Sequence, residues 1–404
     1  MTHFDFPPTP DAALERLAKV DIAAYAKSRN AIGGAVSQLS PYVTHGFLSF
    51  PQIAKSVQHQ AGFSPQHKFV FELGWRAYFH HVWSHLGNDI FKSLHAGVLP
   101  DSAYAQALPI DIQTATTGIP AIDRTVHALH STGYLHNHAR MWLASYVIHI
   151  RKVHWLVGAH WMYGHLLDGD LASNMLSWQW VAGTGSSKPY LFNAENVAKY
   201  APSSWRSEGT VIDTSYERLD QIARSGKAIP VHSPAQARLI ETDTTATAYV
   251  AALQDSHLHF TAPSLTELSS LVANRPVYVV HPWSLGQLPS DLPPDAIVLG
   301  VVDSAFHAAH PWSKQRWTWV IHRMQQITSH CYAPNIDVLQ ASLHLASSVR
   351  YASSPHAVWL SSIAHPKLQT TELPKLFTDV AVYCKSFSQW WNKAKMLPLI
   401  EGDI

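Results

Sequence analysis

Hydrophobic residues recur at helical spacing through the first half of the chain. Residues 10–30 place Leu14, Leu17, Ile22 and Tyr25 three to five positions apart, which is typical of a helix with one buried face. Further helices are predicted at 51–59, 66–86, 120–131, 137–152 and 158–168. None of these segments alternates with a period of two, so this half of the chain is predicted to be all-helical.

The pattern changes after Asn274. Two short runs rich in β-branched residues, PVYVV and AIVLGVV, predict strands at 276–280 and 296–302. Residues 315–327 have helical spacing, and NIDVLQAS (335–342) and VAVYC (380–384) predict two more strands. Strands that alternate with helices predict a smaller α/β domain with a parallel sheet.

A length of 404 residues is too great for one ordinary core and predicts two domains. We expect a helical domain at 1–202 and an α/β domain at 276–404. The segment between them, 203–275, is richer in Ser, Thr and Pro and is predicted to be a connector, with helical stretches at about 214–225 and 245–254.

Composition excludes several classes of protein. Charged residues make up 14% and the net charge is +1, so any nucleic-acid binding would need a local positive groove. Cys331 and Cys384 are too few for a four-cysteine iron–sulfur site or a disulfide framework. The first residues lack the pattern of a signal peptide and no apolar run has membrane-spanning length, so we expect no signal peptide, no membrane segment and a cytoplasmic location.

Paired charges mark the stretch 117–200. Asn137 and Arg140 are three positions apart on a predicted helix and therefore share a face. Asp168 and Asp170 flank Gly169, which we interpret as a flexible point. An arginine and a carboxylate brought together in an aromatic-rich site would form a charge-assisted pair.

Aromatic residues adjoin those charges, because Trp178 and Trp180 follow closely. Aromatic rings beside paired charges suit a flat polar heterocycle such as a flavin. The residues by themselves predict a ligand site, and the alternative is a buried ion pair in a helical core. The chain also holds 15 Trp and 27 His, most of which we expect to pack in the core.

Several motifs in register resemble the FAD-binding domain of DNA photolyases and cryptochromes. In chain order after residue 116 they are TGIPAID, TGYLHNHARM, LLDGDLASN and WQW. The resemblance extends upstream to FELGWRAYFHHV (71–82), SQLSPYVTHGFLS (37–49) and SRN (28–30), and so covers about residues 10–200. It implies a helical FAD-binding fold.

The resemblance assigns the first cofactor contacts to the N-terminal part. Tyr25 corresponds to the aromatic residue that packs at the FAD site. A threonine is common where Val36 stands, so one phosphate contact is expected to be missing. The loop that holds the pyrophosphate corresponds to Ser37, Gln38, Leu39 and Ser40. Hydroxyls and free N–H groups near a helix start suit an anion, although a serine-rich helix cap is the simpler interpretation of this loop alone.

The flavin pocket itself corresponds to later motifs. Asn137 and Arg140 match its Asn and Arg, and the resemblance implies that Arg140 pairs with Asp168. Asp170 is expected to contact the ribityl chain and the flavin ring edge. Asn174 occupies the position opposite flavin N5, where an amide oxygen accepts a hydrogen bond from a protonated N5.

Two tryptophans resemble the chain that carries electrons to the flavin. Trp178 corresponds to the first and Trp155 to the second, although core packing is an equal explanation for Trp155. The usual third tryptophan would fall near Ser102 and is absent. Three other residues are candidates for its place: Tyr104, Trp142 and Trp161.

The lesion pocket of cyclobutane-dimer photolyases is also matched, by Glu72, Trp75, Asn137, Met141 and Trp180. Glu72 would hydrogen-bond the base edges, and the two tryptophans would pack against flipped bases. The (6-4) photolyases typically carry histidine at the positions of Asn137 and Met141. Repair of (6-4) lesions is therefore disfavoured. The resemblance implies a photo-lyase that repairs damaged DNA with an electron from excited reduced FAD.

One departure weakens the match to a repair enzyme. His138 stands where an arginine usually contacts the phosphates of the lesion, and an arginine fork binds phosphate better than a neutral histidine. A single-stranded substrate would fit this loss. Arg76, Arg151 and Lys152 are the remaining candidates for phosphate contacts, or else solvated surface charges. The alternatives to repair are a blue-light photoreceptor and a flavin-binding relic without photochemistry.

The family usually begins with an α/β antenna domain, and such a pattern appears here at the other end of the sequence. Residues 301–327 resemble the antenna stretch in which a strand ends in Asp and a helix starts near Ser-x-x-Arg. Residues 382–394 resemble the segment that leaves that domain. We therefore expect a circularly permuted domain order, with an unrelated α/β module as the alternative. No motif decides whether a second, antenna chromophore binds.

Overall fold

The helical half of the computed structural model follows the predicted pattern. The structure describes residues 5–229 and 260–399. The single helix predicted at 10–30 is two helices, because Asp21 caps a new start by accepting a hydrogen bond from the Ala24 N–H at 2.9 Å. The N-terminal helices are α1 (Pro10–Ala18), α2 (Ile22–Ser28), α3 (Ser40–Thr44), α4 (Phe50–Val57) and α5 (Lys68–Leu86).

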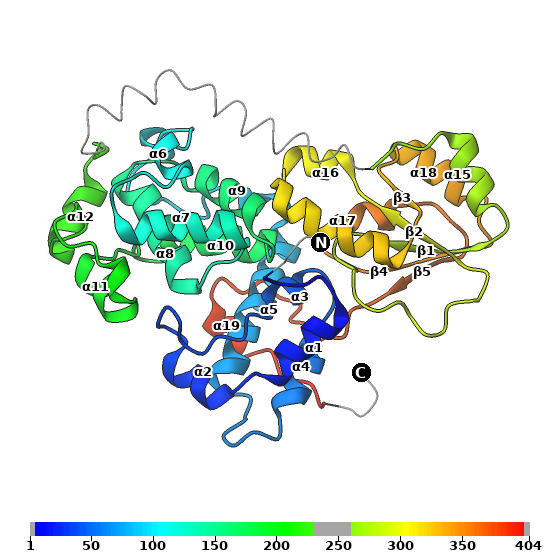
Figure 1. Ribbon diagram of the computed structural model, residues 1–404, viewed down its shortest axis with the longest axis horizontal. Coiled ribbons are helices and arrows are strands. Elements are labelled where there is room, and N and C mark those ends of the chain that lie inside the picture. Colours follow the sequence, from blue (N-terminus) through cyan, green and yellow to red (C-terminus); the bar gives the residue numbers. More distant parts are fainter. Residues whose placement is uncertain (1–4, 230–259, 400–404) are drawn as a thin grey trace.

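The remaining helices of this half form a second group beside the first, and α10 packs on α5 to join the two groups into one all-helical region (Figure 1). The stretch between α5 and α7 is largely irregular, as its sequence suggests. The helices of the second group are α6 (Ile110–Gln113), α7 (Pro120–Thr132), α8 (Asn137–Ser145), α9 (Trp155–His165), α10 (Leu171–Ala182), α11 (Ala194–Tyr200) and α12 (Tyr216–Arg224). Short 3₁₀ turns lie at Gly87–Phe91, Asp101–Ala103 and Ser203–Trp205, and a π-helical turn at Tyr146–Ile150.

The second region is built on a five-stranded sheet, in which all neighbouring strands are parallel, in the order β3-β2-β1-β4-β5. The predicted fold class, a helical domain plus a smaller parallel α/β domain, is confirmed. The strands are β1 (Pro276–Val280), β2 (Ile297–Val301), β3 (Cys331–Tyr332), β4 (Ser348–Ala352) and β5 (Leu368–Thr371). The helices are α15 (Leu265–Val272), α16 (Ser304–Ala309), α17 (Lys314–Ile327) and α18 (Ile336–Leu343), and a 3₁₀ turn covers Val358–Ser362.

Two of the predicted strands are wrong. Residues 335–342 fall largely in α18, because Asn335 caps a helix by accepting from the Asp337 N–H at 2.8 Å, and Leu339 and Leu343 bury one helical face. Residues 380–384 form no strand and lie in a loop. The predictions for β1 and β2 are confirmed. The helix predicted at 245–254 lies outside the described residues.

The carboxyl ends of β1, β2 and β4 point toward the helical region. The strand order reverses between β1 and β4. In open parallel sheets the crevice beside such a reversal, at the carboxyl ends of the strands, is the usual ligand site. Here the loops that follow these strands fill it with their own rings. Trp283 stacks on His307 with 5.8 Å between centroids and on His356 with 5.0 Å, at interplanar angles of 4° and 14°.

The segment after β5 returns to the helical region, where α19 (Phe387–Trp391) packs on α5 (Figure 1). The Phe387 ring stacks on Trp75 at 4.1 Å and 12°. Gly74 leaves room for this segment, because a Cβ atom there would lie 2.3 Å from Cζ3 of Trp391. Residues from both ends of the chain therefore build the layer around α5.

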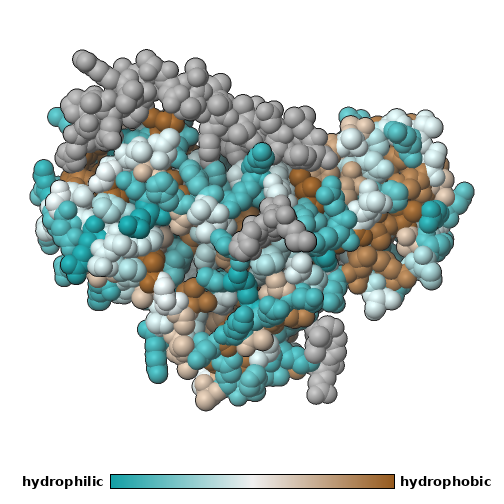
Figure 2. Space-filling view, viewed as in Figure 1, coloured by the Kyte–Doolittle hydropathy of each residue, from teal (hydrophilic) through white to brown (hydrophobic). Residues whose placement is uncertain are grey.

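One continuous core joins the two regions. Trp319 of α17, for example, donates its ring N–H to the Phe6 carbonyl at 2.6 Å. Figure 2 shows hydrophobic residues gathered on one face of the α/β lobe, while the helical part presents a mixed surface. Across residues 5–229 and 260–399, no helix combines the length and the apolar character that a membrane span requires.

Candidate functional site

A cavity of about 490 Å³ opens among α5, α8, α10 and the loop before α3. This volume is within the range of small-molecule sites, about 300–1,000 Å³. Most of the residues predicted from the sequence line it: Tyr25, Ser37, Leu39, Ser40, Glu72, Trp75, Asn137, Arg140, Met141, Asp168, Asp170, Asn174, Trp178 and Trp180. The structure thus brings the expected cofactor residues and the expected lesion residues to one place.

Two predicted residues do not line the cavity. Gln38 has a positive φ of 53°, and its side-chain oxygen accepts a hydrogen bond from Arg16 at 2.6 Å. Trp155 is buried behind the cavity wall and donates its ring N–H to the Ser93 hydroxyl at 3.0 Å. The side chain of Gln38 is therefore directed to another partner.

Arg140 and Asp168 lie together as the family resemblance implies. The Nη2 of Arg140 is 2.7 Å from Oδ2 of Asp168, and its Nε donates to the Leu135 carbonyl at 2.9 Å. The Asp168 side chain is buried, and its second oxygen has no hydrogen-bond partner among the described residues. This pair therefore leaves one buried acceptor free beside the cavity.

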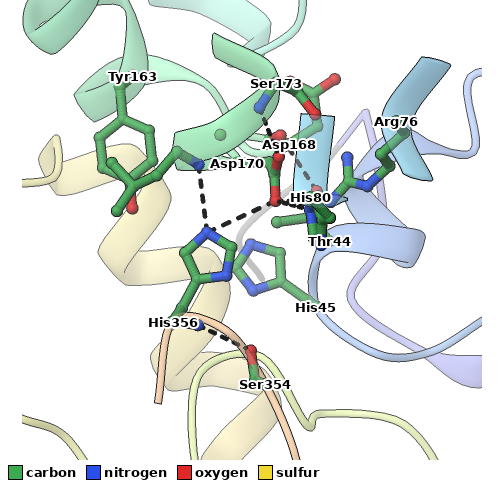
Figure 3. A network of polar contacts seen from close by, with 12 residues as sticks. Thr44, His45, Arg76, His80, Tyr163, Asp168, Asp170, Ser173, Ser354 and His356 are labelled. Atoms are coloured by element: carbon green, nitrogen blue, oxygen red, sulfur yellow. Dashed lines mark hydrogen bonds and ion pairs between the residues drawn. The ribbon is translucent and has the colours of Figure 1, made fainter. Parts of the chain in front are cut away.

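Asp170 is the centre of a wider network (Figure 3). Its Oδ1 caps α10 by accepting from the Ser173 N–H at 2.8 Å. Its Oδ2 is 2.8 Å from Nε2 of His80, 3.2 Å from Nη2 of Arg76 and 3.5 Å from Nε2 of His356. Burial opposes ionisation of this 1% exposed carboxyl, but Arg76 and His80 hold its pKa well below the usual range. Asp170 is therefore a buried carboxylate at neutral pH.

Neither His80 nor His356 was predicted from the sequence as a site residue. A signal for His80 existed, because Glu72, Arg76 and His80 follow one another at intervals of four on α5 and so share a face. No local pattern marks His356. It comes from the α/β region and accepts a hydrogen bond from the Leu171 N–H, 185 residues away in sequence, at 3.2 Å.

Unpartnered oxygens show how the cavity fits FAD. Asn174 donates its amide N–H to the Ala159 carbonyl at 2.8 Å, so its oxygen remains for a ligand. The Ser173 hydroxyl and Oδ1 of Asp168 are buried without a partner among the residues that the structure describes. Ring N–H and sugar hydroxyl groups of a flavin nucleotide are the donors that such oxygens need. The lining residues therefore fit this cofactor.

The residues expected at the lesion are held at the rim of the cavity. Glu72 pairs with Arg29 at 3.0 Å, yet burial raises the pKa of Glu72 above its usual value. Asn137 directs its amide N–H to the sulfur of Met141 at 3.5 Å. Trp180 is 40% exposed, which is high for so large a ring. These side chains keep polar and aromatic surface available at the mouth.

The interpretation of the three candidate phosphate contacts as solvated surface charges is wrong, because each has internal partners. Arg76 bonds Asp170 and Thr44, and Arg151 forms a two-pronged pair with Asp111. Lys152 is only 3% exposed. Its ammonium group donates to three backbone carbonyls, those of His149, Ile222 and Ala223. Arg151 and Lys152 are therefore committed to internal partners, whereas Arg76 also lines the cavity.

His138 cannot replace an arginine at a phosphate. Its ring lies 4.8 Å from that of Tyr200, and its Nδ1 is buried without a partner among the described residues. Burial, together with the charge of Arg29, lowers the pKa of His138 below its ordinary value. The side chain is therefore neutral at physiological pH.

Two of the predicted electron carriers, Trp178 and Trp155, lie against or on α9. Trp178 lines the cavity and touches α9 at Gly158, where an added Cβ would lie 2.4 Å from the ring. Trp155 stands one turn earlier on α9. Its ring is 5.7 Å from His154, which is 6.3 Å from Tyr104. The other two candidates have different ring neighbours: Phe192 for Trp142 and His165 for Trp161.

Comparisons with known proteins agree with this geometry. Residues 69–255 match the family model described as the FAD binding domain of DNA photolyase. A deoxyribodipyrimidine photo-lyase of Streptomyces griseus is 33% identical over 219 residues, which cover 49% of this chain and 46% of that protein. A cryptochrome DASH of Synechocystis sp. is 29% identical over 171 residues, 40% of this chain and 35% of that protein. The matched part thus spans less than half of either relative.

A solved structure of a Synechocystis cryptochrome is 24% identical to this chain and matches it with a TM-score of 0.45. The match covers 59% of this chain and 58% of the cryptochrome chain. The relatives thus divide between photolyases and cryptochromes of the DASH type at about the same identity. In this chain the parallel α/β region follows the matched helical region. The sequence motifs, the cavity that they line and the family match together identify a FAD-binding domain of the DNA photolyase/cryptochrome type within this chain, with the family match at residues 69–255.

Proposed function

We propose that this protein is a light-driven flavoenzyme that repairs cyclobutane pyrimidine dimers in DNA. One observation carries the proposal. The residues that correspond to a dimer pocket come from three helices, α5, α8 and α10, and line the same cavity as the cofactor residues. They are Glu72, Trp75, Asn137, Met141 and Trp180.

The chain would bind FAD through its buried polar groups. Arg140 and Asp168 would orient the ring, and the Asn174 oxygen would accept a hydrogen bond from it. Reduced FAD supplies an electron when it absorbs light. Ser37 and Ser40 would contact the pyrophosphate, with Tyr25 packed beside it.

The rim would hold the flipped dimer. Glu72, with its raised pKa, can share a proton with the edge of a pyrimidine. Trp180 offers an exposed face, and Trp75 is fixed from behind by Phe387, so its other side can pack against a base. Aromatic stacking replaces the base stacking that is lost when the dimer leaves the duplex.

A second function, blue-light sensing, is favoured by two specific observations. The candidate phosphate contacts Arg76, Arg151 and Lys152 are committed to internal partners, which leaves few cations to hold duplex DNA. The rings of Trp155, His154 and Tyr104, which follow one another beyond Trp178, would offer a route for photoreduction. If repair occurs, the same shortage of cations favours a single-stranded substrate, which needs no energy for unpairing.

The domain order also belongs to this proposal. We infer a permuted arrangement, with the helical FAD-binding domain at 1–202, a connector at 203–275 and the antenna-like domain at 276–404. A parallel sheet packed against the helical region supports it, as does the contact of residues 387–391 with α5. The stacked rings around Trp283 occupy the crevice in which a sheet of this kind usually binds a ligand.

The test is repair by the chemically reduced, flavin-loaded protein. Thymine-dimer oligonucleotides, single- and double-stranded, are illuminated with blue light or kept dark, and the remaining dimers are counted. We expect loss of dimers only in the light, at a rate roughly tenfold lower in Glu72→Gln, which loses a charged hydrogen bond at the base edge. Glu217→Gln, on the surface of α12, is the matched control.

The two proposed functions give different results. Full flavin occupancy with no loss of either substrate in the light would rule out repair. Photoreduction of the oxidised protein that depends on Trp178, without repair, would favour the photoreceptor. A protein that takes up no flavin would contradict both.

A further inference from the structure

The cofactor loop between α9 and α10 is held from behind by the α/β region. The Ser313 N–H donates to the Gly164 carbonyl at 2.8 Å, at the end of α9. The Leu171 N–H, at the start of α10, donates to His356 at 3.2 Å. In open parallel sheets the carboxyl ends of the strands commonly bind a ligand. In this protein the loops at those ends bind the cofactor loop instead.

Arg316 makes the central contact of this interface. It comes from the first turn of α17 and is 0% exposed. Its Nη1 donates to the Tyr163 carbonyl at 2.8 Å, and its Nη2 donates to the Gly169 carbonyl at 2.7 Å. The guanidinium group therefore connects the last turn of α9 to the middle of the loop.

No carboxylate forms an ion pair with Arg316 in the described part of the chain. Its guanidinium lies over the Trp312 ring at 3.8 Å and near Tyr163 at 4.8 Å. Burial lowers the pKa of Arg316 to about 10, which still leaves it protonated at neutral pH. The charge is thus stabilised by carbonyl dipoles and aromatic faces.

Gly169 is shaped for this contact. A Cβ atom at this position would lie 2.2 Å from Nη1 of Arg316 and 2.7 Å from the Tyr163 carbonyl oxygen. The glycine that the sequence presents as a flexible point is instead a point of close approach. Its absent side chain lets the guanidinium reach the backbone of the loop.

The two neighbours of Gly169 are the carboxylates of the cavity. Asp168 pairs with Arg140, and Asp170 with Arg76 and His80. A rigid contact at Gly169 fixes both carboxylates, because each is one residue away. The buried positive charge behind the loop also attracts both, which adds an electrostatic contribution to the geometric one.

We propose that Arg316 is a positioning residue for FAD: it holds the Asp168–Asp170 loop in its binding geometry and thereby couples the α/β region to flavin binding. The inference depends on FAD binding in this cavity and not on whether the protein repairs DNA. It gives the α/β region a role that needs no chromophore of its own.

The test measures the affinity of the apoprotein for FAD in the dark and without DNA. In Arg316→Met, loss of two charge-assisted hydrogen bonds is expected to weaken FAD binding by roughly 10- to 100-fold. Arg316→Lys keeps the charge but cannot bond two carbonyls at once, so an intermediate loss is expected. Arg323→Met is the matched control, because Arg323 on the same helix also donates to two carbonyls, those of Leu285 and Gly286.

A second readout separates positioning from simple structural support. The midpoint potential of bound flavin should become more negative in Arg316→Met, which loses a buried positive charge, and should stay near that of the wild type in Arg316→Lys. Equal losses of affinity in Arg316→Met and Arg323→Met would overturn the proposal. If Arg316→Met does not fold, Arg316→Lys decides: wild-type affinity for FAD contradicts the proposal, and weakened binding supports it. A repair assay that fails while these affinities differ would count only against the proposed function.

Discussion

Replacing Asp170 with asparagine removes one charge from the centre of the cavity network. Asparagine caps a helix about as well as aspartate, so the start of α10 should be preserved. Arg76 and His80 would then face a neutral amide. Removing one partner of a buried ionic network costs about 3–5 kcal/mol.

The exposure of the partners sets the expected size of the effect. The side chains of Arg76 and His80 are 19% and 30% exposed, so both keep some access to water. We therefore expect the free energy of unfolding to fall by about 3 kcal/mol in Asp170→Asn, the low end of that range. Asp170→Ala should lose about 1 kcal/mol more, because it also removes the cap.

The pH dependence has a definite sign. The pKa of Asp170 is depressed in the folded protein, so its contribution is fully present above the unfolded value of about 3.9 and is lost as the pH falls toward the folded value. The difference between wild type and Asp170→Asn should be constant near neutrality. Below about pH 4 it should shrink by about 1.4 kcal/mol per pH unit.

Urea unfolding of the apoprotein, followed by tryptophan fluorescence at about pH 7, 5 and 3.5, measures this difference. Asp220→Asn is the control, because Asp220 forms an exposed pair with Arg224 on α12 and should change stability by less than about 1 kcal/mol. The reasoning is refuted if Asp170→Asn unfolds within about 1 kcal/mol of wild type at neutral pH. A difference that does not shrink in acid would refute the electrostatic explanation.

Three further substitutions test other parts of the structure. Lys152→Met leaves three backbone carbonyls without their ammonium donor and should lower the free energy of unfolding by about 2 kcal/mol. The control is Lys227→Met at an exposed position, which should change the free energy of unfolding by less than about 0.5 kcal/mol. Equal effects of the two substitutions would contradict the assigned role of Lys152. Gly158→Ala places a Cβ 2.4 Å from the Trp178 ring and should slow photoreduction while FAD absorbance is kept; an unchanged rate would exclude this ring from the route. Phe387→Ala should lower the free energy of unfolding by about 3 kcal/mol in the same urea assay, and a loss below about 1 kcal/mol would show that α19 is not part of the core.

The elements that the sequence predicted well have strong local patterns. The long helix α5 and strands β1 and β2 are rich in apolar residues with clear boundaries. Strand β4 was missed because Ser348 and Arg350 interrupt its short run. The segment that became α18 has a strand-like composition, and the Asn335 cap decides its structure. Local capping thus outweighed β propensity.

An interaction in the site could be predicted from the sequence where each of its two residues belongs to a recognisable motif. Arg140 and Asp168 are 28 positions apart, yet each belongs to a recognisable segment. The role of Lys152 was not predictable in this way. Two of its three acceptors are backbone carbonyls 70 and 71 positions away, and any residue type can supply a carbonyl. A positive charge in a sequence does not show whether its partner is a phosphate, a carboxylate or the protein's own backbone.

For the same reason, the α/β region could not be linked to the flavin pocket from the sequence. Arg316 reaches backbone atoms 147 and 153 positions earlier, and those atoms leave no chemical mark on the sequence. Only Gly169 records the contact, because a larger residue would collide with the guanidinium. A glycine between two functional carboxylates suggests mobility in a sequence, but in a packed interior it can equally mean that another group needs the space. Here the space is taken by a buried cation, so the loop that carries Asp168 and Asp170 is shaped by a region that follows it in the chain by more than a hundred residues.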